Sequence, residues 1–155
     1  MKLERATIEK YPNLHYYVRV NMPEVRNVTA IVSQIKRLSG STKRATIMKA
    51  LKWGEAPTVK VVSGLVCAGV KAYGCYSWGS AEIQIDEDLV KDFEAGKGLA
   101  KNASGKRVYL LGATLLHELT HWADAQDGVD NPVPGDPLNE EGNAFEKGVY
   151  GKVLP

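Results

Sequence analysis

The chain has 155 residues, a length that suits one domain with a single hydrophobic core. Its 44% hydrophobic and 25% charged residues are typical of a globular protein, and no apolar stretch approaches the roughly 18 residues that cross a bilayer. The net charge is +2, but residues 1–60 carry twelve Lys and Arg against four Asp and Glu, whereas residues 113–155 carry two against eight. A basic half can contact nucleic acid or membranes, yet no stacking aromatics accompany these residues in a nucleic-acid motif, so solvated helix faces are the simpler interpretation.

The first fifty-odd residues are predicted to be mainly helical. One helix is expected from Pro23 to Gly40, because apolar residues recur at helical spacing between a proline near the start and a glycine at the stop. A second helix is expected at residues 42–54. The segment 14–20, LHYYVRV, fits either a helix or a strand.

A small sheet is predicted in the middle of the chain. Residues 58–67 are rich in valine and form the first expected strand, with residues 73–78 as its expected partner. Residues 81–86, AEIQID, alternate apolar and polar side chains, which places the apolar ones on one face of a third strand. Asp86 or Asp88 is then expected to cap a short helix.

The two cysteines, Cys67 and Cys75, flank the sequence AGVKAYG, whose glycines indicate a turn between two strands. A cross-strand disulfide fits this arrangement and would indicate an oxidising compartment. Two buried free thiols fit it as well. The spacing excludes a CxxC motif, and the sequence has no further cysteine to complete a cysteine-rich metal site.

A long helix is predicted from Arg107 to about Asp127, after a polar loop. Its apolar stripe contains Val108, Gly112, Leu115, Leu119 and Trp122, and its opposite stripe contains Thr114, His117, His121 and Asp124. The histidines therefore lie outside the stripe that packing alone would bury. After a proline-rich loop, Asp136 is expected to be the N-cap, and Pro137 the first residue, of a last helix that ends near Tyr150.

The stretch LLHELTHWADA contains an HExxH motif, formed by His117, Glu118 and His121. Histidines four apart share one helix face, so their ring nitrogens can converge on one cation, and the glutamate between them can reach a water bound to the metal. Zinc lowers the pKa of such a water toward about 7, so a carboxylate can take its proton at neutral pH. The sequence therefore predicts a hydrolytic zinc site with Glu118 as the general base, in preference to two partly exposed histidines beside a salt-bridged glutamate.

Two arrangements compete for the third protein ligand. A ligand ten residues after the first histidine would be Asp127, but such sites have a glycine where this chain has Asp124, and they need a downstream methionine that this chain lacks. In the other arrangement the ligand is a glutamate of the last helix. The candidates there are Glu140, Glu141 and Glu146.

The last helix resembles that of the gluzincin (thermolysin-type) metallopeptidases, which carries the pattern ExGxxNExxxD. EEGNAFEKGVY matches it as ExGxxFExxxY, and this resemblance places the zinc ligand on Glu146. Gly142, one turn earlier, would leave room for the metal and the facing helix, because helical side chains lean toward the N-terminus. Glu141 is the alternative, whereas Glu140 is expected to point away.

The resemblance is incomplete at one position. Tyr150 stands where the family has an aspartate, so a carboxylate that orients a histidine would have to come from elsewhere, and Asp124 is a candidate. Tyr150 itself is expected to reach that histidine or to donate a hydrogen bond to the oxyanion, and is a predicted catalytic residue on this basis.

The combination of LLHELTHWAD with FEKGVYG is also similar to minimal zincin domains at the C-termini of bacterial polymorphic and secretion-system toxins (Tox-MPTase-like). The similarity covers about residues 80–151, and the first eighty residues contribute nothing to it. It implies a domain of a larger effector that is secreted or delivered into a target cell or periplasm, which would fit the absence of an apolar signal-peptide core. It also implies a protein or peptide substrate and a cognate immunity protein.

These observations predict an α+β fold, a minimal zincin in which residues 1–155 form a single metallopeptidase domain. Residues 1–55 are expected to be mainly helical, and residues 56–155 to supply a small sheet, the HExxH helix that it packs on and the glutamate helix. The expected activity is zinc-dependent hydrolysis of peptide bonds by a monomer, with no membrane partner. If the strand at residues 81–86 is an edge strand, it could pair with an extended substrate. The alternatives are a zinc-binding module without turnover and a nucleic-acid-associated protein.

Overall fold

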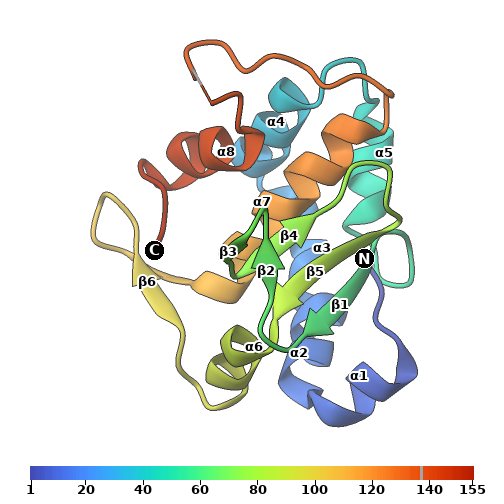
Figure 1. Ribbon diagram of the computed structural model, residues 1–155, viewed down its shortest axis with the longest axis vertical. Coiled ribbons are helices and arrows are strands. Elements are labelled where there is room, and N and C mark those ends of the chain that lie inside the picture. The colour runs from blue at the N-terminus through green and yellow to red at the C-terminus, as the bar shows by residue number, and fades with distance from the viewer. Residues whose placement is uncertain (137) are drawn as a thin grey trace.

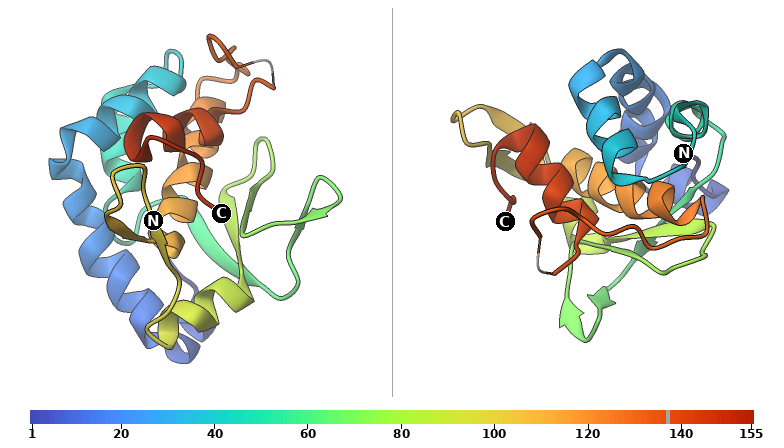
Figure 2. Two further views of the ribbon diagram at one scale, coloured as in Figure 1. Left: turned by 90° about the vertical axis from the view of Figure 1, so that its left-hand side faces the viewer. Right: turned by 90° about the horizontal axis from the view of Figure 1, so that it is seen from above.

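In the computed structural model, which describes residues 1–136 and 138–155, a long helix runs between a small sheet and a group of helices (Figures 1 and 2). This helix, α7 (Leu110–Ala125), contacts the sheet on one side and helix α4 (Thr29–Leu38) on another. Helix α8 (Glu141–Tyr150) lies against both α7 and α4. The α+β class expected from the sequence is confirmed.

The main sheet has three strands in the order β1 (Thr58–Val62), β5 (Glu82–Asp86) and β4 (Gly74–Tyr76). Strand β5 pairs in parallel with β1 and antiparallel with β4. The prediction that residues 73–78 pair with residues 58–67 is therefore wrong, because β5 inserts between them. The expectation that β5 could be an edge strand is wrong for the same reason, and β4 forms the edge next to α7.

The central position of β5 explains its sequence. Ile83 and Ile85 are fully buried and face the core, as their alternation predicts. Asp86 ends the strand and is the N-cap of helix α6 (Glu87–Glu94), which confirms one of the two predicted caps. One carboxylate oxygen of Asp86 accepts a hydrogen bond from the backbone N–H of Asp88, and the other from that of Leu65.

The N-terminal part is helical, including the ambiguous segment LHYYVRV. The predicted continuous helix from Pro23 to Gly40 is interrupted, since Val28 has a non-helical backbone and α4 begins only at Thr29. The remaining helical elements of this part are α1 (Arg5–Lys10), α2 (Pro12–Tyr16), a π-helical turn (Tyr17–Asn21), α3 (Met22–Glu24), a 3₁₀ turn (Val25–Asn27) and α5 (Arg44–Ala50).

Two short hairpins lie outside the main sheet. The first joins β2 (Val66–Cys67) to β3 (Val70–Lys71), and a disulfide between Cys67 and Cys75 ties it to the edge strand β4. Of the two interpretations of the cysteines, the structure therefore confirms the disulfide and not the free thiols. The second hairpin joins β6 (Leu99–Lys101) to β7 (Arg107–Tyr109), so α7 begins at Leu110 and not at Arg107 as predicted.

Helix α8 begins later than the sequence suggested. Residues 138–140 are not helical, and Glu140 is the N-cap, with its side chain accepting a hydrogen bond from the backbone N–H of Asn143. The N-cap prediction for Asp136 is therefore wrong, and the prediction for Pro137 falls outside the described residues. Among the described residues, no helix has the length and apolar character needed to cross a membrane.

Candidate metal centre

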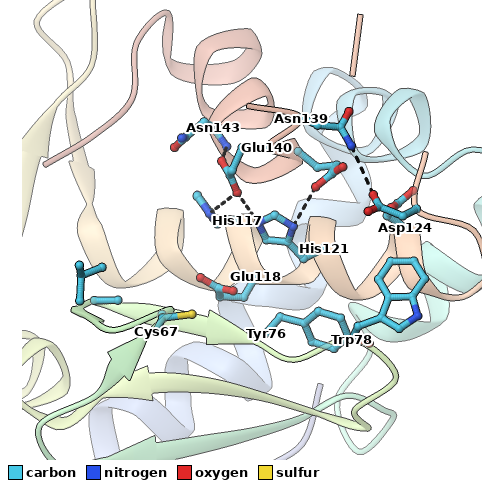
Figure 3. Close-up of a pocket in the computed structure, with 15 residues that line it drawn as sticks. Cys67, Tyr76, Trp78, His117, Glu118, His121, Asp124, Asn139, Glu140 and Asn143 are labelled. Atoms are coloured by element: carbon cyan, nitrogen blue, oxygen red, sulfur yellow. Dashed lines mark hydrogen bonds and ion pairs between the residues drawn. The ribbon is translucent and has the colours of Figure 1, made fainter. Parts of the chain in front are cut away.

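The HExxH motif lies on the middle of α7, where the helix lines a cavity of about 650 Å³ (Figure 3). The cavity is bounded by α7, the edge strand β4 and the segment that leads into α8. The His117 and His121 side chains are about one-fifth exposed, whereas Thr114 and Asp124 on the same stripe are buried. Access to the two imidazoles is therefore from the cavity.

A single carboxylate oxygen faces both imidazoles. Oε1 of Glu140 lies 2.5 Å from Nε2 of His121 and 3.4 Å from Nε2 of His117. Figure 3 shows Glu140 reaching the imidazoles from the side of α8, with Glu118 on the side of the sheet. The three ligand atoms lie within 4.8 Å of one another.

Two further glutamates contact the other ring nitrogens. Oε1 of Glu146 lies 2.7 Å from Nδ1 of His117, and Oε2 of Glu141 lies 3.1 Å from Nδ1 of His121. The second oxygen of Glu146 accepts a hydrogen bond of 2.6 Å from the backbone N–H of Leu154. Each imidazole is thus held between two carboxylates, with Nδ1 oriented by one of them and Nε2 directed at Glu140.

The carboxylates dominate the protonation of the histidines. Burial lowers the pKa of His117, but Glu140 and Glu146 outweigh it and raise this pKa to about 10. Burial also lowers the pKa of His121, but hydrogen bonds with Glu140 and Glu141 outweigh it and raise this pKa to about 9. Burial also tends to raise the pKa of Glu140, yet its hydrogen bonds to the two histidines lower it overall. Without metal, both imidazoles are therefore cationic near neutral pH.

Glu118 is only 5% exposed, and it lies against the edge strand at Gly74. A Cβ at Gly74 would lie 2.7 Å from Cγ of Glu118 and from Cγ2 of Thr114, so only glycine allows β4 to pass this close to α7. Burial raises the pKa of Glu118, and the charges of His117 and His121 partly oppose this rise.

Gly142 likewise allows α8 to lie close to α7, because it has no side chain. A Cβ at this position would overlap the imidazole ring of His117. The sequence prediction that Gly142 leaves room at the site fits this close approach, although the side chain given room is the imidazole.

The structure brings His117, Glu118 and His121 together with Glu140, Glu141 and Glu146, but it gives the glutamates different places from those predicted. Glu146 contacts Nδ1 of His117 and not the Nε2 side. Glu140, expected to point away, faces both Nε2 atoms because it precedes the helix and has an extended backbone. The density of turn-forming residues in NPVPGDPLN was the signal for a later helix start.

The other predicted residues lie apart from the two Nε2 atoms. Asp124 accepts hydrogen bonds from Asn131, and it is Glu141 that contacts His121. Asp127 accepts hydrogen bonds from the backbone N–H groups of Ser41 and Val129. Tyr150 packs edge-on against Phe145 and is not among the residues that line the cavity. The catalytic role of Tyr150 stays a prediction that this geometry does not support.

Two imidazole nitrogens and one carboxylate oxygen are the donor set of a catalytic metal site with three protein ligands and an open position. This set fits a divalent metal because the three atoms already converge beside a cavity that can admit a substrate. The HExxH motif and this donor set are those expected of a metallopeptidase.

The comparison with protein-family models agrees with this class. The model of the family described as metallopeptidase toxin 3 matches residues 7–151, and the chain belongs to this family. The match includes the N-terminal helices, so the expectation that the first eighty residues contribute nothing to the resemblance is wrong. No match was found among curated proteins or among solved structures. The chain is thus a metallopeptidase of toxin type.

Proposed function

We propose that this toxin domain is a zinc-dependent endopeptidase in which His117, His121 and Glu140 hold the metal. The observation that carries the proposal is the approach of both Nε2 atoms to one carboxylate oxygen. The choice of Glu140 departs from the assignment of Glu146 made from the sequence. Glu146 contacts the Nδ1 side of His117, where a carboxylate orients an imidazole that binds metal through Nε2.

The donor set favours zinc among divalent ions. Imidazole and carboxylate ligands in a three-residue site suit Zn²⁺, whereas Ca²⁺ and Mg²⁺ prefer oxygen donors only. When bound, zinc supplies Lewis acidity, which polarises a carbonyl and lowers the pKa of a water to about 7.

The remaining steps belong to residues of the chain. Glu118 accepts a proton from the attacking water at its carboxylate and later donates it to the leaving amine, which its burial beside the histidines supports. Glu146 and Glu141 accept Nδ1–H hydrogen bonds and so keep each Nε2 lone pair directed at the metal position.

The position of the edge strand β4 supports a role in binding the substrate. Gly74 and Tyr76 of β4 line the cavity beside the histidines, and the far edge of β4 has no partner strand among the described residues. An extended peptide can add to such an edge through backbone hydrogen bonds. This role replaces the one expected for residues 81–86, which form the central strand.

The toxin family and the disulfide bear on where the domain acts. Disulfides persist in oxidising compartments, so Cys67–Cys75 supports secretion or delivery to a periplasm or cell surface. A cognate immunity protein would then protect the producing cell.

The proposal is tested with three single substitutions, each assayed for bound zinc and for cleavage of an unfolded protein. Glu118→Gln should retain one zinc and lose activity by about 10²- to 10⁴-fold, the contribution of a general base. Glu140→Gln should lose zinc altogether. Glu146→Gln should weaken zinc binding by only about 10- to 100-fold, as expected for a residue that orients a ligand.

Different outcomes separate the alternatives. Retained zinc in Glu140→Gln together with complete loss in Glu146→Gln would restore Glu146 as the ligand. One tightly bound zinc without cleavage of any denatured substrate would identify a non-catalytic zinc module.

A further inference from the structure

A second group of carboxylates lies behind His121, away from the two Nε2 atoms. Asp124 of α7, Asp130 of the following loop and Glu141 at the start of α8 place one oxygen each within 4.8 Å of one another. Asp124 and Glu141 are buried, with 1% and 5% of their surfaces exposed, and Asp130 is open to solvent.

One oxygen of this group has no partner. Oε2 of Glu141 contacts Nδ1 of His121, but Oε1 is buried and makes no hydrogen bond in the described residues. A buried carboxylate oxygen without a donor carries the full cost of desolvation, so an unpaired oxygen of this kind indicates a missing ligand.

The nearby chain offers little positive charge to this group. The sequence has no Lys or Arg between Tyr109 and Phe145, and in the described structure no Lys or Arg forms an ion pair with any of the three carboxylates. The neutral amides of Asn131 and Asn139 donate to Asp124 and Asp130, at 2.6 Å and 3.4 Å. Apart from the contact of Glu141 with His121, the described contacts bring no positive charge to the group.

We propose that Asp124, Asp130 and Glu141 form a calcium site, separate from the zinc site. The donors are all carboxylate oxygens, which hard cations prefer, and one of them comes from an irregular loop. Ca²⁺ accepts such irregular geometry, whereas Mg²⁺ requires a near-octahedral arrangement. A bound Ca²⁺ supplies a partner for Oε1 of Glu141 and joins the loop before α8 to α7.

The site also connects to the zinc centre through Glu141. Glu141 belongs to the group, its Oε2 contacts Nδ1 of His121, and its Oε1 has no other partner in the described residues and would bind the calcium. Calcium therefore fixes the side chain that orients a zinc ligand, and it holds the segment that delivers Glu140.

The test is a calorimetric titration of the full chain with CaCl₂, with and without saturating zinc. We expect one site with a dissociation constant of about 10⁻⁴ to 10⁻³ M, the range of extracellular calcium modules, and at least tenfold weaker binding of Mg²⁺. At about 10 mM calcium the Tm should rise by roughly 3–10 °C. Asp130→Asn should weaken calcium binding at least tenfold, and because Asp130 is exposed this variant should fold.

Two variants serve as controls. Asp136→Asn alters another acidic residue of the same loop and should leave calcium binding unchanged. Glu140→Gln should lose zinc and keep calcium, which separates the two sites and keeps this test independent of the proposed peptidase activity.

Three results would overturn the proposal. The first is no calcium heat and no rise in Tm at about 10 mM, which would mean that the three carboxylates do not hold a calcium ion. The second is binding that Asp130→Asn does not weaken, and the third is calcium binding that is lost in Glu140→Gln, which would place the ion between the histidines.

Discussion

The two glycines of helix α8, Gly142 and Gly148, differ in the side chain that packs against each of them. A Cβ at Gly142 would overlap the His117 ring, which the surrounding glutamates hold in place. A Cβ at Gly148 would lie 2.6 to 2.9 Å from the side-chain amide of Gln34, which can rotate away. The two positions therefore form a matched pair for testing how closely α8 must approach the metal centre.

Gly142→Ala should weaken zinc binding by about 10- to 100-fold, comparable with the loss of a residue that orients a ligand, because the methyl group displaces His117. Gly148→Ala should keep zinc affinity, and it should be neutral or stabilising by up to about 1 kcal/mol, since alanine favours a helix over glycine. Zinc titrations and urea unfolding of both variants measure these effects. Equal zinc affinity in the two variants would contradict the close packing of α8 on His117.

The protonation of the histidines predicts a pH dependence of the metal-free chain. The pKa values of His117 and His121, about 10 and about 9, lie above the ordinary value of 6.5. A raised pKa in the folded state contributes stability that is complete below pH 6.5 and is lost as the pH rises through 9 and 10. The Tm of the metal-free chain should therefore fall between pH 7 and 10, and the zinc-loaded chain should not show this loss.

The same values predict proton release. Zinc binds neutral imidazoles, so its binding at pH 7 should release about two protons per ion. Calorimetry in buffers of different ionisation enthalpy measures this number. Release of no protons would mean that the imidazoles are already neutral. Glu146→Gln, which keeps zinc but removes a carboxylate that raises the pKa of His117, should reduce the number.

At the scale of elements, the sequence predicts helices better than it predicts strand pairing. The HExxH helix follows from local periodicity, which a sequence displays directly. Its predicted stripes hold only in part, because Val108 lies in β7 and Thr114 and Asp124 are buried. The sheet order does not, because residues 58–62 and 74–76 are separated by β5, which comes later in the chain. The sequence did not predict that Glu140 faces the histidines. It placed the helix start four residues too early, and a Glu140 inside the helix would point in another direction.

The disulfide is the element-scale feature that holds the edge strand to the hairpin beside the cavity. Cys67 and Cys75 are eight residues apart, and closing a loop of this length stabilises the folded state by about 2–3 kcal/mol in the chain-entropy account. Replacing both cysteines with alanine should lower the free energy of unfolding by this amount in urea titrations. Zinc stoichiometry should stay at one per chain, because neither cysteine is among the proposed ligands. An unchanged stability would show that the hairpin is held by other contacts.

At the scale of the whole molecule, the N-terminal helices and the metal centre share one core. Ile35 of α4 is fully buried together with Leu115 of α7 and Phe145 of α8, and α4 packs against both helices. The family match from residue 7 onward agrees with this arrangement. The positions of α7 and α8, which frame the candidate metal centre, therefore depend on a helix that precedes the sheet by about twenty residues.

This shared core predicts that residues 1–155 unfold as a single unit. Ile35→Ala should lower the free energy of unfolding by about 2–5 kcal/mol, the cost of removing a buried aliphatic side chain. Zinc release and loss of helical circular dichroism should follow the same urea transition, since no part of the core can unfold alone. Val28→Ala provides the control, because Val28 is 43% exposed and its loss should change stability by no more than about 0.5 kcal/mol. If zinc stayed bound after the helical signal of the N-terminal part had been lost, these helices would be a separate domain, and the metal centre would not need α4 to hold α7 against α8.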